Sequence, residues 1–391
     1  MTDTADVVII GGGVNGSSIA YHLAKRGFGK IVLVEKNALA SGSTGKSAGI
    51  VRQHYSNPVI IQMVMESRKF FEGIAEELGG YPGFVQNGFL LLVAEQEKEA
   101  LKANVAAQRD LGLEVDLVPP DELSRFFPGI NTEGVALASY EDTSGYADPH
   151  GTSVAFAEKA KQLGVDLQLG CQVLRLLVKN DAIYGVETDR GVIETQIIVN
   201  AAGPWGKELV RPVGIELPLI PRRLQETVVK SGDYGTHNPT VIDLHQLVYF
   251  KPEPGGLILV GGGITDDTNP VNPDQYKEQA DFETIADVTE RLAFRMPDLA
   301  EASFIRGWAG VITVTPDFHP ILGKAPELDG LIHAMSCSGH GFKLSPAVGM
   351  LISELIMDGR TTTIDISALG PDRFEKGETF SSRYKAFPIL A

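Results

Sequence analysis

The stretch VVIIGGGVNG occupies residues 7–16 and places a glycine-rich run directly after four apolar residues. The apolar run predicts a buried strand, and the residues from about Asn15 to Arg26 have the pattern of a helix. A second apolar run, Ile31–Val34, ends on Glu35. Strand, glycine turn, helix and strand form the context in which G-x-G-x-x-G binds the pyrophosphate of a dinucleotide.

Each glycine of this motif has its own physical task. Gly11 permits a tight turn, Gly13 lets the backbone approach a pyrophosphate, and Gly16 lets the helix pack close to the strand. The helix N-terminus adds free N–H groups and a partial positive charge. Glu35 follows the last glycine at close to the roughly 20-residue spacing of an acid that binds ribose hydroxyls. Its carboxylate would repel a 2′-phosphate and argues against NADP, whereas NAD, FAD and an empty turn all remain open.

Composition limits the class of protein and its partners. The 391 residues exceed one ordinary domain and suggest two. A net charge of −16 disfavours nucleic acid or an anionic membrane as a general partner, because both are negatively charged. Cys171 and Cys337 form no disulfide framework and lack the spacing of zinc ligands, so we expect no metal site.

The N-terminal residues predict the location of the protein. Met1–Asp6 contain no basic segment, and the apolar run that follows is too short for the core of a signal peptide. The chain also lacks an apolar run of about 18 residues that would span a membrane. We therefore expect a cytoplasmic protein.

The first half of the chain mixes helices and strands. The segment Ser41–Arg52 is rich in small and hydroxyl residues, which suits a loop wrapped along a ligand or, alternatively, a solvated linker. Further helices are predicted at Pro58–Leu78, Glu95–Leu111 and Asp148–Leu163, and Pro119–Leu123 is predicted to be a turn that starts a short helix. Strands are predicted at Phe89–Val93, Asp166–Leu169, Val173–Val178, Ala182–Thr188 and, as one strand, Gly191–Asn200.

The second half predicts an antiparallel sheet and then a return to the first pattern. Residues 215–315 hold several β-type runs and one clear helix, Phe282–Phe294. Strand Leu331–Met335, a glycine turn at Ser336–Lys343 and helix Ala347–Met357 then repeat the opening arrangement. The predicted fold is therefore α/β, a Rossmann-like dinucleotide-binding domain (1–80, 145–215 and 316–391) plus a mostly antiparallel β-sheet substrate domain (81–144 and 216–315).

Several motifs in this order resemble the FAD-dependent D-amino acid oxidase superfamily. The nearest resemblance is to the branch with monomeric sarcosine oxidase, glycine oxidase and the β subunits of heteromeric sarcosine oxidase and dye-linked L-proline dehydrogenase. The motifs are Gly11–Gly16 with Glu35, Ser41–Arg52, Val199–Trp205, Arg306–Gly310, Thr315–Asp317 and Ser338–Lys343. The resemblance covers nearly the whole chain.

The resemblance implies FAD as the cofactor. Gly11, Gly13 and Gly16 would hold its pyrophosphate and Glu35 its adenosine ribose. The C-terminal glycine turn would lie near the flavin pyrimidine, where N–H groups and a cation stabilise the negative charge of reduction. The other expected cofactor-binding residues are Val14, Asn15, Lys36, Ser43, Thr44, Lys46, Ser47, Val173, Ala202, Gly203, Trp205, Gly310, Gly339, His340, Gly341, Phe342 and Lys343.

Four residues are implied on the substrate side. Arg52 matches an arginine that binds the substrate carboxylate bidentately, and Lys343 matches a lysine that contacts the same carboxylate. Tyr249 falls where relatives have a pocket tyrosine, although an ordinary core tyrosine is an equal alternative. His54 neighbours Arg52 and is expected to line the pocket. A structural role for Arg52 is the alternative to its functional one.

Departures from the family pattern carry further predictions. Gly310 and Lys46 stand where relatives attach FAD through cysteine or histidine, so we expect noncovalent FAD. Pro149 stands where the heteromeric sarcosine oxidase subunit attaches FMN to histidine, which makes covalent FMN doubtful. Segment Val260–Gly263 lacks the lysine that speeds the reaction of sarcosine oxidase with oxygen. An oxidase and a dehydrogenase are therefore both open.

The sequence thus predicts an FAD-dependent oxidoreductase that oxidises the C–N bond of a small amino acid. The substrate is expected to be secondary or N-methylated, and hydride transfer to flavin N5 would give an imine that water hydrolyses. The alternatives are a hydroxy-acid or polyol dehydrogenase and the catalytic β subunit of a heteromeric complex. A partner subunit or a homo-oligomer is accordingly possible.

Overall fold

The computed structural model describes residues 3–79, 83–232, 234–262, 269–335 and 337–384. Its first large sheet has six strands, and all neighbours are parallel except the last pair. In spatial order the strands are β10 (Asp166–Leu169), β3 (Ile31–Glu35), β2 (Val7–Ile10), β14 (Ile198–Asn200), β21 (Leu331–Met335) and β20 (Ile321–Lys324). The predicted Rossmann-like sheet is confirmed.

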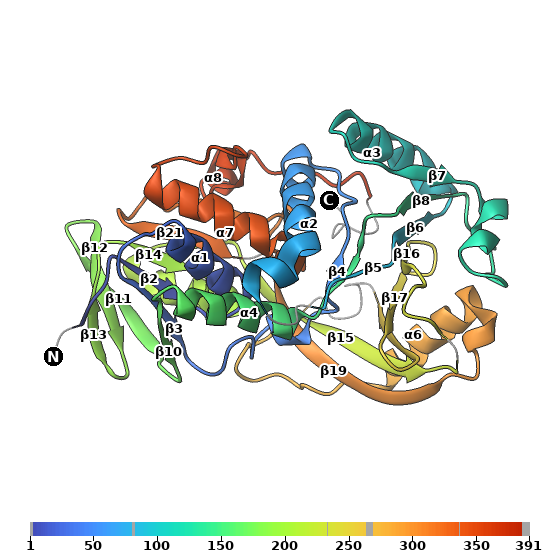
Figure 1. Ribbon diagram of the computed structural model, residues 1–391, viewed down its shortest axis with the longest axis horizontal. Helices are drawn as coiled ribbons and strands as arrows, with labels where there is room; N and C mark the ends of the chain where they lie inside the picture. The colour runs from blue at the N-terminus through green and yellow to red at the C-terminus, as the bar shows by residue number, and fades with distance from the viewer. Residues whose placement is uncertain (1–2, 80–82, 233, 263–268, 336, 385–391) are drawn as a thin grey trace.

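Four helices pack together beside this sheet (Figure 1). Their bounds are α1 (Val14–Lys25), α2 (Pro58–Leu78), α4 (Pro149–Gln162) and α7 (Gly341–Met357). The apolar side chains that they share with β2 and β3 form one buried core, which includes Ile9, Ile19 and Leu33. Burial of apolar area is the main force that holds such a layered core together.

Helix α7 begins six residues earlier than the sequence pattern suggested. It starts at Gly341 rather than Ala347 and contains Pro346. A proline lacks the N–H that would bond to the carbonyl four residues before it, here that of Phe342. The hydroxyl of Ser345 donates to this carbonyl at 2.8 Å instead. The glycine turn is correspondingly shorter, and Gly341, Phe342 and Lys343 form the first turn of the helix.

The second large sheet has eight strands and is antiparallel except for one pair, β16 with β6. In spatial order the strands are β19 (Ser303–Val314), β15 (Ile220–Lys230), β18 (Leu257–Gly262), β17 (Val248–Glu253), β16 (Thr240–Asp243), β6 (Phe89–Val93), β8 (Leu137–Glu141) and β7 (Asp116–Val118). Helices α6 (Phe282–Arg295) and α3 (Lys98–Asp110) pack against it. Segments 81–144 and 216–315 thus share one sheet; the domain boundaries remain a prediction.

The predicted single strand Gly191–Asn200 is two strands in different sheets. Its first part, β13 (Gly191–Glu194), pairs with β12 (Ala182–Thr188) and β1 (Asp3–Thr4), and β11 (Val173–Lys179) completes that four-stranded sheet. The chain bends at Gln196, and beside this bend the hydroxyl of Thr195 accepts a hydrogen bond from Ile197 N at 3.2 Å. Such side-chain bonds to the backbone compete with strand pairing.

The remaining elements are short. A small sheet joins β4 (Ile50–Val51), β9 (Gly145–Tyr146) and β5 (Val85–Gln86), while α5 (Gly206–Val210) and α8 (Arg373–Lys376) are brief helices. The predicted helix from Glu95 begins as a 3-10 turn, and the predicted turn from Pro120 is also 3-10. Within the described ranges, no helix combines the length and apolar composition that crossing a bilayer requires.

Candidate active site

A cavity of about 700 Å³ is lined by residues of both large sheets. On one side it meets the carboxyl ends of β2, β3 and β14, which is where ligands bind in open α/β sheets. On the other side it meets one face of the second sheet, including Leu224, Ile242 and Tyr249. The cavity lining therefore offers residues for a dinucleotide site on one side and a separate wall for a substrate on the other.

The structure brings nearly all of the predicted site residues to this cavity. The predicted residues that line it are Gly11, Gly13, Val14, Asn15, Glu35, Lys36, Ser43, Thr44, Lys46, Ser47, Arg52, Val173, Ala202, Gly203, Trp205, Tyr249, Gly310, Gly339, His340, Gly341, Phe342 and Lys343. Two predicted residues, Gly16 and His54, are outside its lining. Residues far apart in sequence thus form one site.

The junction of β2 with the first turn of α1 has room only for glycine at two positions. Gly11 has φ of +112°, and a Cβ there would lie 2.5 Å from the carbonyl oxygen of Ala201. A Cβ on Gly16 would overlap the carbonyl oxygen of Gly11. Gly16 therefore serves the close packing of helix and strand rather than direct contact with a ligand, and both glycines keep the turn compact.

The N-terminus of α1 is prepared for an anionic group. No acidic residue occupies its first turn, and Val14 N donates to the hydroxyl of Thr44 at 3.1 Å. Asn15 Nδ2 donates to Cys337 Sγ at 3.3 Å, while its buried Oδ1 has no hydrogen-bond partner among the described residues. The helix dipole and free N–H groups at such an end favour a phosphate.

Glu35 is held in place at the end of β3. Its carboxylate accepts hydrogen bonds from Gly12 N at 2.7 Å and Asn37 N at 2.8 Å. Asp274 closes the same end of the cavity, because its Oδ1 accepts from Lys36 Nζ at 2.7 Å and from Trp205 Nε1 at 2.9 Å. Sequence reasoning missed Asp274, which lies in a loop with no local signal for a ligand site.

Arg52 directly follows β4 and is almost fully buried, with 3% exposure. Its guanidinium donates to the carbonyl of His54 and stacks on the ring of Tyr55, 4.0 Å from the ring centroid. Burial lowers the pKa of Arg52 from its ordinary value. Desolvation of a cation is costly, so an anion bound in the cavity would be strongly favoured there.

His54 lies behind the cavity wall, which corrects the expectation that it lines the pocket. Its Nε2 is 2.7 Å from the hydroxyl of Tyr384, and its Nδ1 is 3.9 Å from Glu141. Burial and, secondarily, the Arg52 charge lower the pKa of His54 to about 3, and burial raises the pKa of Glu141 to about 7. The His54 side chain is therefore placed to support the Arg52 loop.

Lys343 occupies the first turn of α7 and is 6% exposed. Burial, followed by the nearby charge of Arg52, holds its pKa well below the ordinary lysine value. The preceding His340 packs edge-on against Tyr55, with ring centroids 5.1 Å apart. The turn and the Arg52 loop are thus in direct contact, and the two cations belong to one site.

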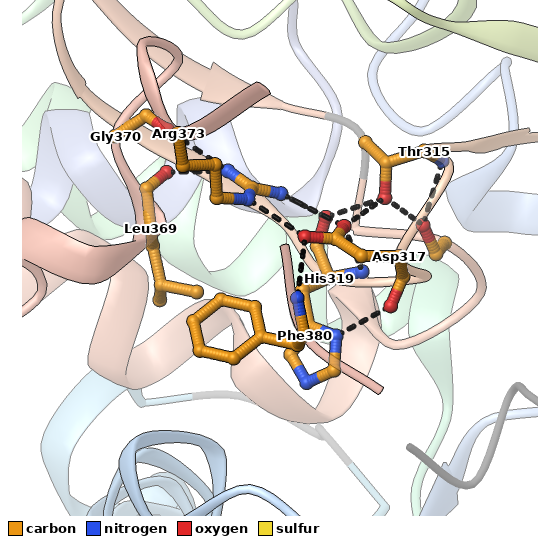
Figure 2. A network of polar contacts seen from close by, with 8 residues as sticks. Thr315, Asp317, His319, Leu369, Gly370, Arg373 and Phe380 are labelled. Atoms are coloured by element: carbon orange, nitrogen blue, oxygen red, sulfur yellow. Dashed lines mark hydrogen bonds and ion pairs between the residues drawn. The ribbon is translucent and has the colours of Figure 1, made fainter. Parts of the chain in front are cut away.

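A buried polar network supports the glycine turn (Figure 2). Arg373 donates to both carboxylate oxygens of Asp317, at 2.8 and 3.1 Å, and to the carbonyls of Leu369 and Gly370. Thr315 completes the link: its hydroxyl donates to Asp317 at 3.0 Å, and its N–H donates to Ser338 Oγ at 3.2 Å. The network ties the C-terminal segment to the start of the turn.

A sequence model of the DAO family, described as FAD dependent oxidoreductase, matches residues 6–355. The chain belongs to this DAO family. Its cofactor is therefore FAD, and the geometry fits that assignment through the glycine turn and the buried Asn15 Oδ1, which has no hydrogen-bond partner among the described residues. The resemblance inferred from the sequence motifs is confirmed.

Relatives within the DAO family cover almost the whole chain. FAD-dependent oxidoreductase domain-containing protein 1 of Xenopus laevis is 33% identical over 97% of this chain and 85% of that protein. Mitochondrial dimethylglycine dehydrogenase of Rattus norvegicus is 30% identical over 96% of this chain, which spans only 46% of that longer protein. The solved structure of L-proline dehydrogenase from P. horikoshii has a TM-score of 0.90 and 32% identity, covering 97% of this chain and all of that one.

Lys46 and Gly310, the two positions compared with sites of covalent attachment, lie side by side in the structure. Lys46 contacts the hydroxyl of Tyr276 and lies 3.3 Å from Glu278, and a Cβ on Gly310 would lie 2.9 Å from the Lys46 Cβ. Noncovalent binding remains our prediction for this FAD. Gly263, part of the segment compared for an oxygen-activating lysine, and Ser336 of the predicted turn lie outside the described residues.

A further observation concerns metal ions. The described ranges hold no cluster of three or more His, Cys, Asp or Glu side chains that could bind a metal ion.

Tyr249 donates a hydrogen bond from its hydroxyl to Glu226 at 2.6 Å, and both residues line the cavity. Sequence reasoning missed Glu226, since a lone glutamate in a β-rich segment has no motif around it.

Proposed function

We propose that this DAO-family chain oxidises the C–N bond of a small α-amino acid. The observation that carries the proposal is the pair of buried cations, Arg52 and Lys343, in the same cavity as the FAD-binding turn. Burial lowers the pKa of both side chains, and the charge of Arg52 further lowers the pKa of Lys343. A carboxylate would offset both desolvation costs, so the site selects a substrate with this group.

The proposed mechanism uses these residues for positioning and electrostatics. FAD, when bound, supplies the hydride acceptor. Arg52 binds the substrate carboxylate through its planar guanidinium, and Lys343 adds a second positive charge near it. This orientation presents the C–H bond next to nitrogen to the cofactor, and water then hydrolyses the imine product. The first turn of α7 offers N–H groups and a positive dipole end where negative charge develops.

A secondary or N-methylated amine is the substrate class that we propose. The support comes from the relatives, because dimethylglycine dehydrogenase and L-proline dehydrogenase are named for substrates of this kind. Their names also favour an electron acceptor other than oxygen for this chain.

The test is anaerobic reduction of the purified flavoprotein. We expect at least one amino acid from a panel that includes sarcosine, dimethylglycine, L-proline and glycine to bleach the flavin spectrum. A matched panel of 2-hydroxy acids should leave it unchanged. Bleaching by hydroxy acids alone, or by no compound at all, would overturn the proposal. Reoxidation by air or by an artificial dye then separates an oxidase from a dehydrogenase.

A further inference from the structure

Glu226 and Tyr249 meet across three neighbouring strands of the second sheet. Glu226 of β15 lies opposite Gly261 of β18, and Gly261 lies opposite Tyr249 of β17. Residues in such a row point to the same face. A Cβ on Gly261 would overlap the Tyr249 ring, so glycine there lets the ring cross to Glu226. Tyr249 then donates to Glu226 Oε1 at 2.6 Å.

The second carboxylate oxygen of Glu226 lacks a donor. Glu226 is 2% exposed and lines the cavity, and its Oε2 has no hydrogen-bond partner among the described residues. Lys251 of β17, a buried cation whose charge acts on Glu226, is already paired with Glu253 at 2.6 Å. A buried carboxylate oxygen without a donor is costly, and a donor supplied by a ligand would remove that cost.

The charges that line the cavity match those of a zwitterion. Arg52 and Lys343 provide positive charge for a carboxylate, and Glu226 provides an acceptor of opposite sign. An α-amino acid enters the site with a carboxylate and an ammonium group. A hydroxy acid carries only the first of these, so Glu226 would distinguish the two substrate classes.

We propose that Glu226 binds the ammonium group of the substrate through Oε2 and accepts one proton from it before hydride transfer. This inference rests on the proposed amino acid oxidation. The N–H bond breaks, an O–H bond forms on Glu226, and the electron pair stays on the substrate nitrogen. FAD, when bound, would supply the acceptor for hydride from the carbon next to this neutral amine, whereas an ammonium group has no free electron pair to assist the loss of hydride.

The environment of Glu226 suits this proton transfer. Burial raises its pKa to about 8, while the hydrogen bond from Tyr249 and the charge of Lys251 act in the opposite direction. Glu253, beside Lys251, adds a smaller effect that raises the pKa. On the other side of β15, Trp308 of β19 lies opposite Glu226 in register and carries no charge. A base with a raised pKa holds a proton from an amine better than an ordinary carboxylate does.

The test compares Glu226→Gln with the wild-type holoenzyme by anaerobic stopped-flow flavin reduction, using the amino acid that bleaches the wild type. At pH 8 we expect the variant to be slower by roughly 10²-fold. Its rate should then rise about tenfold per pH unit as solution, instead of Glu226, deprotonates the amine. Glu226→Asp should recover part of the rate. Glu290→Gln, which removes an exposed carboxylate of α6, should behave like the wild type.

A binding measurement separates amine recognition from general damage. Tetrahydrofuran-2-carboxylate has the carboxylate and ring of proline but an oxygen in place of the nitrogen. Its affinity, read from the shift of the flavin spectrum, should be equal in Glu226→Gln and wild type. If Glu226→Gln fails to fold, Glu226→Asp and Tyr249→Phe should both show a reduced rate with normal affinity for this analogue.

Two outcomes would overturn the inference alone. One is a Glu226→Gln variant with wild-type rate and pH profile. The other is a loss that is equal at every pH and extends to the analogue, which indicates a structural role. A wild-type flavin that no amino acid bleaches would refute the proposed function itself and this inference with it.

Discussion

The hydroxyl of Tyr384 lies 2.7 Å from Nε2 of His54, and this contact joins the C-terminal segment to the loop that carries Arg52. Arg52 is in turn held by His54, because its guanidinium donates a hydrogen bond to the His54 carbonyl. Both side chains of the His54–Tyr384 pair are fully buried. The position of the proposed carboxylate ligand therefore depends on a segment more than 300 residues away.

Tyr384→Phe should weaken substrate binding more than it slows chemistry. The substitution removes one hydrogen bond from buried His54 and leaves its Nε2 without that partner, at a cost of about 1–3 kcal/mol in the free energy of unfolding. Because the Arg52 loop loses support, the KM for the amino acid should rise several-fold while kcat changes little. Urea unfolding and steady-state kinetics measure the two effects. An unchanged KM with the expected loss of stability would show that the contact does not position Arg52.

Arg52→Lys should not be a conservative change. Lysine keeps the charge but loses the planar pair of donors that matches a carboxylate. A charge-assisted hydrogen bond contributes about 1.5–3 kcal/mol, so the dissociation constant for a carboxylate ligand should increase roughly 10- to 100-fold. Titration of the flavin spectrum with the ligand gives this constant. Equal affinity in the two proteins would assign Arg52 a structural role.

Asp317→Asn should strongly destabilise the fold, because it leaves the buried Arg373 guanidinium without its charged partner (Figure 2). Breaking a buried ion pair costs about 3–5 kcal/mol in the free energy of unfolding. Asp372→Asn is the matched control, since its exposed pair with Lys376 contributes at most about 1 kcal/mol. Urea denaturation gives the free energy of unfolding of both variants, and a similar loss of stability in the two would contradict the prediction.

The Asp317–Arg373 pair should also make stability depend on acid pH. Burial acts to raise the pKa of Asp317, but the hydrogen bonds and charge of Arg373 outweigh it and leave the folded pKa below the ordinary 3.8. The stabilisation is therefore present above pH 3.8 and is lost as pH falls through the folded pKa. Wild type should lose stability more steeply than Asp317→Asn in this range. Urea unfolding at each pH measures the free energy of unfolding of both proteins. The same pH dependence in wild type and Asp317→Asn would contradict the prediction.

Gly11→Ala should yield protein with little bound FAD. Its Cβ would meet the carbonyl of Ala201, which directly follows β14, and would disturb the turn that we expect to hold the pyrophosphate. Gly27→Ala is a matched control for backbone strain, because Gly27 also has positive φ, +73°, but has open space around a Cβ. The ratio of flavin to protein absorbance after purification reports occupancy. Full occupancy in Gly11→Ala would show that the turn can shift to accept a side chain.

Local sequence patterns were sufficient to predict most elements and much of the cavity wall. The apolar run of β2, the helix Pro58–Leu78 and the strand Leu331–Met335 have the predicted character because their periodicity and flanking glycines act within a few residues. The start of α7 was missed because proline is disfavoured inside a helix. Here the hydroxyl of Ser345 donates to the Phe342 carbonyl, which Pro346 leaves without its helical N–H donor.

The sequence by itself determined the Rossmann-like unit, the family resemblance and most of the predicted residues that line the cavity, since glycine spacing and apolar runs are local properties. The tertiary structure alone decided that His54 lies behind the cavity wall and that Glu226 faces into it. It also decided that Gly191–Asn200 divides between two sheets. These features depend on strand register and long-range packing, which bring together residues that no short stretch of sequence connects.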